Sequence, residues 1–496
     1  MNTSPVIKAQ AVAAIVLTVV FYVTAIGLAL VLLAVPVLEW REAHTLHLKL
    51  LLFCLVGAYA LITAVIPRRT PFEAPGPRIT PGTDPDLLRE IHGVARATGQ
   101  RMPDEIYLLP DVNAWVADVG RKRVLAVGLP LMSVLSVQEL RAVIAHEFGH
   151  YAGGDTRLGS LLYRGRQSMI RAAHELKESG SVLHYPFRWY ALAYLRLTHA
   201  MSRQQEFAAD RVAAHLAGQG AAVNALNTVE RSGLAFGRYW ASEAGPVVGQ
   251  GFLPPVMEGF RTFMCAPNVQ NFLNHVTDQT RDSKAGAYDT HPPMPVRVKA
   301  IQALPATTAH LKEDTRSALS LLRSPAASEA ALLGDMLDSR VLEPVSWDDV
   351  AARVWLPLWQ EEVQGVRAAL GRLTPAQLPA LLAAPDARQH LIFDLAADVE
   401  KDTADAVLLR RLSVALSLLL VGRGYEVQTA PGEPLLFRQG DHTVNAFELL
   451  GALSHSDDRA GATSTYHDFL TRSGVADLPL DSGITGSAAP RAVSRA

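Results

Sequence analysis

The residues with the clearest chemical meaning form the segment HEFGH at positions 146–150. Histidines spaced four residues apart share one face of a helix, so His146 and His150 can bind the same Zn²⁺ ion. Glu147, next to the first of them, can accept a proton from a metal-activated water and act as general base. The spacing therefore predicts one hydrolytic zinc site per chain.

A further protein ligand must come from outside this segment, because catalytic zinc sites use three protein ligands and leave one position open for water. The metzincin pattern would place a histidine at position 156, but that residue is Thr156. The third ligand is then expected to be a carboxylate on a later helix. The candidates are Glu175, Glu178 and Glu206.

Glu206 is the preferred candidate of the three. Residues 174–178 form a charged stretch that is typical of a solvated helix face. Asp210 follows Glu206 by one helical turn, so both side chains lie on one face. A carboxylate there can accept a hydrogen bond from a ligating histidine and fix its tautomer.

Two helices must position these groups. The first is predicted to begin at Ser136, which forms a capping box with Glu139, and to end at Gly153. The second is predicted over about residues 199–217, before Gly218.

Upstream, the pattern predicts a helix over 86–98 and short strands over 106–109 and 124–127. Residues 113–115 are expected in the connection between the strands. The strand over 124–127 could pair with an extended substrate backbone.

The N-terminus carries two long uncharged runs, Ala9–Leu38 and Leu50–Ile66. A helix over the first would be about 45 Å long, which exceeds a hydrocarbon core of about 30 Å. A cleaved signal peptide has an apolar region of only about 7–15 residues, which this run exceeds. We therefore expect a two-span helical hairpin in a lipid bilayer.

Basic residues indicate the orientation of this hairpin. Outside it lie Lys8, Arg68, Arg69 and Arg78, whereas the loop between the spans carries two basic residues offset by two acidic ones. The positive-inside rule then favours a cytoplasmic location for the bulk of the chain.

Composition excludes several other classes of protein. Among 496 residues, 46 are Lys or Arg and 48 are Asp or Glu, so no basic excess points to nucleic acid. With two cysteines, a disulfide framework and a cysteine-ligated iron–sulfur cluster are ruled out.

Several motifs together resemble the M48 metallopeptidases, which are membrane zinc endopeptidases of the HtpX and CAAX prenyl protease types. They are HEFGH, the segment SRQQEFAAD at 202–210, the segment NAW at 113–115 and the segment DTHP at 289–292 with Arg297. The resemblance covers about residues 80–304 and, more loosely, the hairpin.

The resemblance implies a role for one more histidine and sets a limit on the substrate. It places His291 near the site, where this residue is either a donor to the reaction's oxyanion or a histidine of a proline-rich turn. Arg297 is expected to support that segment or pair with Asp289. Residues 158–199 contain no span-length apolar run, so prenyl-protein processing is not expected.

The predicted fold is α+β: a mainly helical zincin-type domain with a small sheet, after the hairpin and before a mixed α/β region. The predicted boundaries are a hairpin over 1–66, a proline-rich linker over 67–85, the peptidase domain over 86–304, a regulatory or partner-binding region over 305–481 and a disordered tail over 482–496.

The predicted function is a zinc metalloendopeptidase of the bacterial inner membrane, with a cytoplasmic catalytic domain that acts in protein quality control or processing. Its partners are protein or peptide substrates and the lipid bilayer, with no nucleic acid. A regulatory protein or self-association is expected through residues 305–481. The alternatives are a catalytically silent membrane-anchored interaction protein and a zinc exopeptidase.

Overall fold

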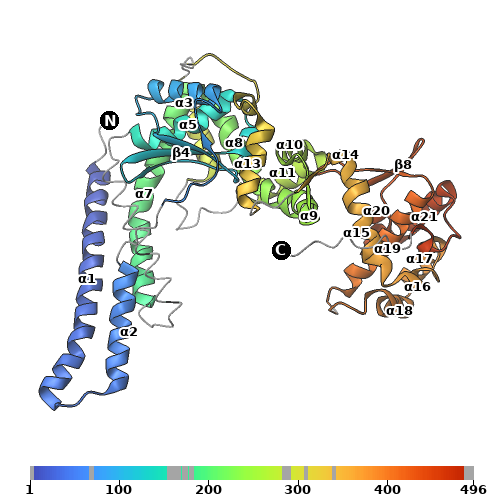
Figure 1. Ribbon diagram of the computed structural model, residues 1–496, viewed down its shortest axis with the longest axis horizontal. Helices are drawn as coiled ribbons and strands as arrows, with labels where there is room; N and C mark the ends of the chain where they lie inside the picture. The colour runs from blue at the N-terminus through green and yellow to red at the C-terminus, as the bar shows by residue number, and fades with distance from the viewer. Residues whose placement is uncertain are drawn as a thin grey trace. The chain divides into compact units, whose positions relative to one another are not determined.

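The computed structural model divides into two compact units, and each is described here by itself (Figure 1). The metal-site unit comprises Met1–Leu234 and Leu273–Asp338, and the second unit comprises Ala235–Phe272 and Ser339–Ala496. The described residues are 5–65, 72–152, 169, 177, 184–281, 292–305, 311–337, 342–400 and 402–484.

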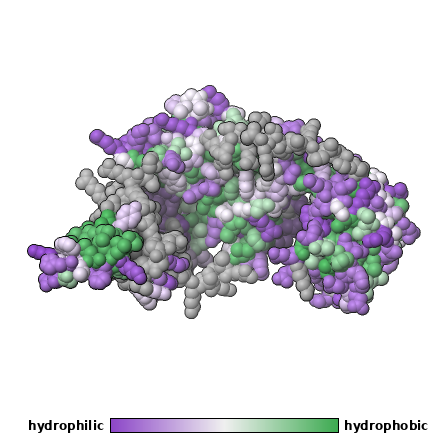
Figure 2. All heavy atoms as spheres, turned by 60° about the horizontal axis from the view of Figure 1, so that its bottom comes forward, coloured by the Kyte–Doolittle hydropathy of each residue, from purple (hydrophilic) through white to green (hydrophobic). Residues whose placement is uncertain are grey.

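The chain begins with two apolar helices, α1 (Pro5–Ala43) and α2 (Leu48–Val65), which lie side by side (Figure 1). Figure 2 shows their exposed apolar side chains as a patch at its left. Within α1, Val12–Ala43 is long and apolar enough to cross a membrane, whereas the apolar stretch of α2, Leu48–Thr63, is shorter. One candidate span is therefore found, and the second span stays a prediction.

The metal-site unit contains a four-stranded sheet with strand order β1-β2-β4-β3. Strands β2 and β4 are parallel, and the other neighbouring pairs are antiparallel. The bounds are β1 (Arg78–Ile79), β2 (Glu105–Leu109), β3 (Ala114–Val119) and β4 (Lys122–Gly128).

The sheet corrects two sequence-based predictions. Residues 113–115 do not form a plain connection, because β3 begins at Ala114. The strand over 124–127 is part of β4, whose two edges are taken by β2 and β3, so its expected pairing with substrate is wrong. Among its described residues, the predicted linker over 67–85 contains β1, whose edge position tolerates the neighbouring prolines because only one side of the strand is paired.

Helices surround this sheet in the metal-site unit. They are α3 (Pro85–Ala97), α4 (Leu129–Val134), α5 (Val137–Ala152), α7 (His184–Ala217), α8 (Gln219–Tyr239), α11 (Pro267–Arg281), α12 (Met294–Gln302) and α13 (Pro325–Met336), and α8 and α11 continue into the second unit. A 3-10 turn, η2, covers Ala318–Leu321.

Helix α7 is longer than predicted, since it begins at His184 rather than near residue 199. Its first half packs on α1, where the Tyr190 hydroxyl donates to the Leu17 carbonyl at 2.5 Å and Phe187 lies edge-on to Phe21. Arginines interrupt the apolar pattern of this half, so its helical periodicity is weak. The predicted end before Gly218 is confirmed, because Gly218 adopts φ +92°.

The second unit mixes helices with a small sheet, as predicted for the C-terminal region. Its helices are α9 (Gly245–Gly249), α10 (Val256–Cys265), α14 (Trp347–Val350), α15 (Leu356–Gln364), α16 (Arg367–Leu370), α17 (Leu378–Ala383), α18 (Pro385–Ala396), α19 (Ala404–Gly422), α20 (Ala446–His455) and α21 (Arg459–Ser473). Two short segments are π-helical, η1 (Trp240–Ala244) and η3 (Ala351–Trp355), and two are 3-10 turns, η4 (Pro375–Gln377) and η5 (Leu480–Gly483).

The strands of this unit are β5 (Phe252–Leu253), paired with β6 (Glu343–Pro344), and β7 (Glu426–Gln428), β8 (Leu436–Gln439) and β9 (His442–Val444). Strands β7 and β8 form an antiparallel hairpin, and β9 pairs with β8 to extend it. Helix α19 supplies much of the hydrophobic core of the unit. The predicted tail over 482–496 lies mostly outside the described residues, although Ile484 is buried.

Candidate metal centre

The helix that carries HEFGH, α5, begins as the sequence predicts. The Ser136 N–H donates to the Glu139 carboxylate at 2.8 Å, and the Glu139 N–H donates to the Ser136 hydroxyl at 3.2 Å. This reciprocal pair satisfies two of the backbone donors that a helix N-terminus leaves exposed.

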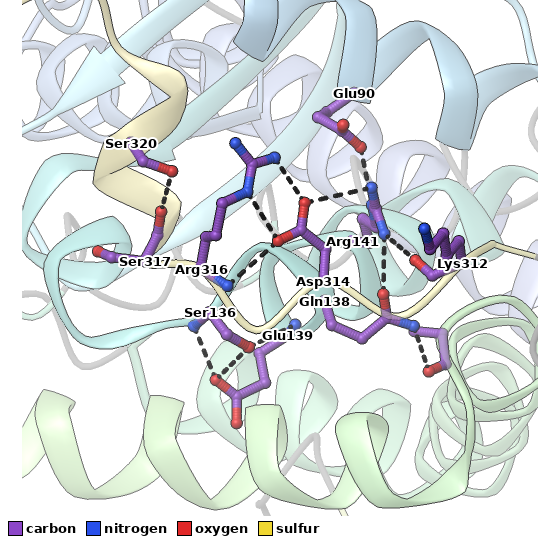
Figure 3. Close-up of polar contacts among 11 residues, drawn as sticks. Glu90, Ser136, Gln138, Glu139, Arg141, Lys312, Asp314, Arg316, Ser317 and Ser320 are labelled. Carbon is purple, nitrogen blue, oxygen red and sulfur yellow. Dashed lines mark hydrogen bonds and ion pairs between the residues drawn. The ribbon is translucent and has the colours of Figure 1, made fainter.

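A strap from beyond α12, residues 312–318, completes this N-terminus (Figure 3). The Val137 N–H donates to the Arg316 carbonyl at 2.8 Å, and the Gln138 N–H donates to the Asp314 carbonyl at 3.0 Å. The buried Arg141 donates to the strap at the Lys312 carbonyl, 2.7 Å away. The position of α5 therefore depends on residues distant in sequence.

A close helix crossing brings the two halves of the site together. A Cβ atom on Gly149 would lie 2.7 Å from the Cα of Ala209, so only glycine fits where α5 meets α7. This approach places the face of α7 that carries Glu206 against the histidines of α5.

His146, His150 and Glu206 form a group that could hold a metal ion, with one ligand atom of each within 4.8 Å of the others. Glu206 Oε2 lies 3.6 Å from His146 Nε2, and Glu206 Oε1 lies 3.8 Å from His150 Nε2. Ligands about 2.0–2.2 Å from a tetrahedral zinc are about 3.4 Å apart, so small adjustments suffice. The donor set and its spacing fit zinc.

Asp210 orients the first histidine. Its Oδ1 lies 3.1 Å from His146 Nδ1, which leaves Nε2 directed toward the group. Arg297 holds Asp210 in turn, with its Nε at 2.9 Å and its terminal nitrogen at 2.6 Å from the two carboxylate oxygens. Burial by itself would raise the pKa of Asp210, but the hydrogen bonds from Arg297 and His146 lower it to about 2.

Arg297 also lies 3.3 Å from Glu206 Oε2, so one guanidinium serves both carboxylates of α7. On sequence grounds Arg297 is expected to support the DTHP segment or to pair with Asp289, whereas its contacts in the structure are with Asp210 and Glu206. Asp289 and His291, its expected neighbours, lie outside the described residues, as do Glu175 and Glu178.

Glu147 stands beside the group and is half-buried. Burial raises the pKa of Glu147 to about 7, against the lowering effects of His146 and of a hydrogen bond from the Val116 backbone. A carboxyl group with a pKa near neutrality suits proton transfer in both directions.

Comparisons with known proteins agree with this geometry. The model of peptidase family M48 matches residues 81–304. Protease HtpX of Pseudomonas entomophila is 27% identical over 280 residues, which cover 51% of this chain and 85% of that protein. Protease HtpX of Ectopseudomonas mendocina is 28% identical over 284 residues, which cover 52% and 88%. No solved structure matches this chain.

Proposed function

We propose that the protein is a membrane-anchored zinc endopeptidase of peptidase family M48, whose model matches residues 81–304. The observation that carries this proposal is the convergence of His146, His150 and Glu206 on one point, with Glu147 beside them. His146 and His150 would bind zinc through their Nε2 atoms, and Glu206 through its carboxylate. Asp210 and Arg297 keep these ligands in position.

Bound zinc supplies a Lewis acid that polarises the scissile carbonyl and lowers the pKa of water from 15.7 to about 7. Glu147 accepts the proton of the attacking water on its carboxylate and then delivers it to the nitrogen of the leaving amine.

The substrate is proposed to lie along β3 rather than β4. Among the described strands, β3 is at the edge of the sheet that adjoins α5, and it packs on that helix. An extended peptide that adds to such an edge is bound mainly through its backbone. Broad sequence specificity would follow, in keeping with a role in quality control or processing.

The membrane anchor is proposed to be the α1–α2 hairpin with two spans. Support comes from the exposed apolar side chains along both helices. Helix α2 is short, and a bilayer can thin locally around a short apolar helix that spans it. The excess of basic residues outside the hairpin supports a cytoplasmic site at a bacterial inner membrane.

The test is casein cleavage by the full-length protein in detergent with zinc, comparing the wild type with Glu147→Gln. We expect cleavage by the wild type alone, a loss of at least about 10³-fold in the variant, and one zinc per chain in both. Equal zinc content without cleavage by either protein would instead support an interaction protein. Products that shorten only from chain ends would support an exopeptidase.

A further inference from the structure

The outer edge of β3, which pairs with no described strand, exposes the backbone groups of alternate residues only. Asn113 accepts a hydrogen bond from the Gly128 N–H at 2.7 Å, at the start of the antiparallel pairing with β4. Residues of an antiparallel strand alternate in direction, so Ala114, Val116 and Asp118 turn their backbone groups away from β4. A substrate strand could pair only at these three positions.

Helix α5 already contacts the middle position, Val116. The Val116 carbonyl accepts a hydrogen bond from the Tyr151 hydroxyl at 2.9 Å. The N–H and C=O of one strand residue point the same way, so Tyr151 lies on the side of Val116 that faces away from β4.

The Arg123 side chain packs on Tyr151 and keeps it in this position. The Arg123 guanidinium lies over its ring, 4.2 Å from the centroid, and Arg123 Nε donates to the Asp118 carboxylate at 3.0 Å. Three side chains thus gather at the part of β3 beyond Val116.

We propose that Tyr151 is a specificity-determining residue that occupies the Val116 carbonyl and so ends the substrate-binding edge of β3 at that residue. This inference rests on the proposed endopeptidase function. Its ligand class is an extended peptide whose backbone pairs near Ala114. A substrate residue that reaches Val116 gains no hydrogen bond from its carbonyl and the strand pairing is interrupted there, so the enzyme is indifferent to peptide length on that side.

The test uses the full-length zinc-loaded protein and fluorogenic peptides lengthened one residue at a time on either side of a single cleavage site. In the wild type, kcat/KM should stop rising with length on one side. Tyr151→Phe frees the Val116 carbonyl, so the ratio of kcat/KM between the longest and shortest peptides on that side should rise about 3–10-fold, the value of one hydrogen bond. Tyr151→Ala, which also removes the ring, should raise the ratio at least as much.

Tyr107→Phe is the matched control, because it removes a hydroxyl bonded to Glu105 on β2, away from the outer edge of β3. It should leave the length ratio unchanged. A Tyr151→Phe variant that keeps its zinc but loses kcat/KM equally for all peptides would overturn the proposal, since Tyr151 would then only support the fold. A zinc-loaded wild type that cuts no peptide would remove the endopeptidase function and this inference with it.

Discussion

The two units of this chain differ in the kind of polar side chain that they bury. Among the described residues, the metal-site unit buries five charged side chains, and the second unit buries none. Those five are Asp84, Arg141, Glu206, Asp210 and Arg297. The buried polar side chains of the second unit are serines, of which Ser413 and Ser417 donate to carbonyls of their own helix, α19.

Ion pairs in the second unit lie at its surface. Arg410, for example, binds both oxygens of Glu362 with side chains 55% and 23% exposed, whereas Arg297 and Asp210 make the same two-pronged contact at 8% and 5%. Buried charges cost several kcal/mol in desolvation and persist where they serve a purpose. The contrast teaches that the metal-site unit contains buried charges, three of which meet at the candidate metal centre, where Arg297 contacts both Glu206 and Asp210. The second unit is stabilised by apolar packing.

The sharpest test of this contrast replaces the arginine of each pair. Arg297→Met should lower the free energy of unfolding by about 3–5 kcal/mol, because two buried carboxylates lose their counter-charge. Arg410→Met should change it by at most about 1 kcal/mol, as for exposed pairs. Chemical denaturation monitored by hydrogen exchange in each unit measures both values. Equal effects would remove the distinction.

Zinc removal should affect the units differently as well. At a hundredfold excess of free zinc over its dissociation constant, binding stabilises the folded state by about 2.7 kcal/mol. Chelation should therefore speed hydrogen exchange in α5 and α7 and leave α19 unchanged. The variant Glu206→Gln is the control, since its exchange should hardly respond to chelation. A response of α19 as large as that of α5 would contradict the prediction.

The pH dependence of the zinc-free protein follows from Glu147. Its folded pKa of about 7 lies above the ordinary value of 4.5, so its contribution favours folding most below pH 4.5 and declines as pH rises to 7. After allowance for partial exposure, we expect a loss of about 1–2 kcal/mol between pH 5 and 7. Urea unfolding at both pH values measures it, and Glu147→Gln should reduce the difference by that amount.

The smallest effect is expected in the second unit. Ser417→Ala removes a hydroxyl bonded to the Ser413 carbonyl within α19, and it should shift the free energy of unfolding by less than about 1 kcal/mol. Thermal unfolding of the two proteins side by side measures the shift. A loss of several kcal/mol would show that this core also depends on polar contacts.

Much of the site could be predicted because it depends on local spacing. The four-residue interval between His146 and His150 and the capping box at Ser136 follow from helix geometry alone, and both agree with the structure. Asp210 was predicted beside a ligating histidine for the same reason, and it lies 3.1 Å from His146. The first half of α7 could not be predicted from the local pattern, because it packs on α1, a helix far away in the sequence.

By itself, the sequence determined the residue types at the site, the helices that carry them and the apolar N-terminus, since each follows from periods of a few residues. Tertiary structure alone decided which strand lies at the edge of the sheet, that Arg297 serves both Asp210 and Glu206, and that Tyr151 engages Val116. These are contacts between segments far apart in the chain or on different elements. The spacing of residues within one helix or strand does not indicate these contacts, because they depend on how the helices and the sheet pack together.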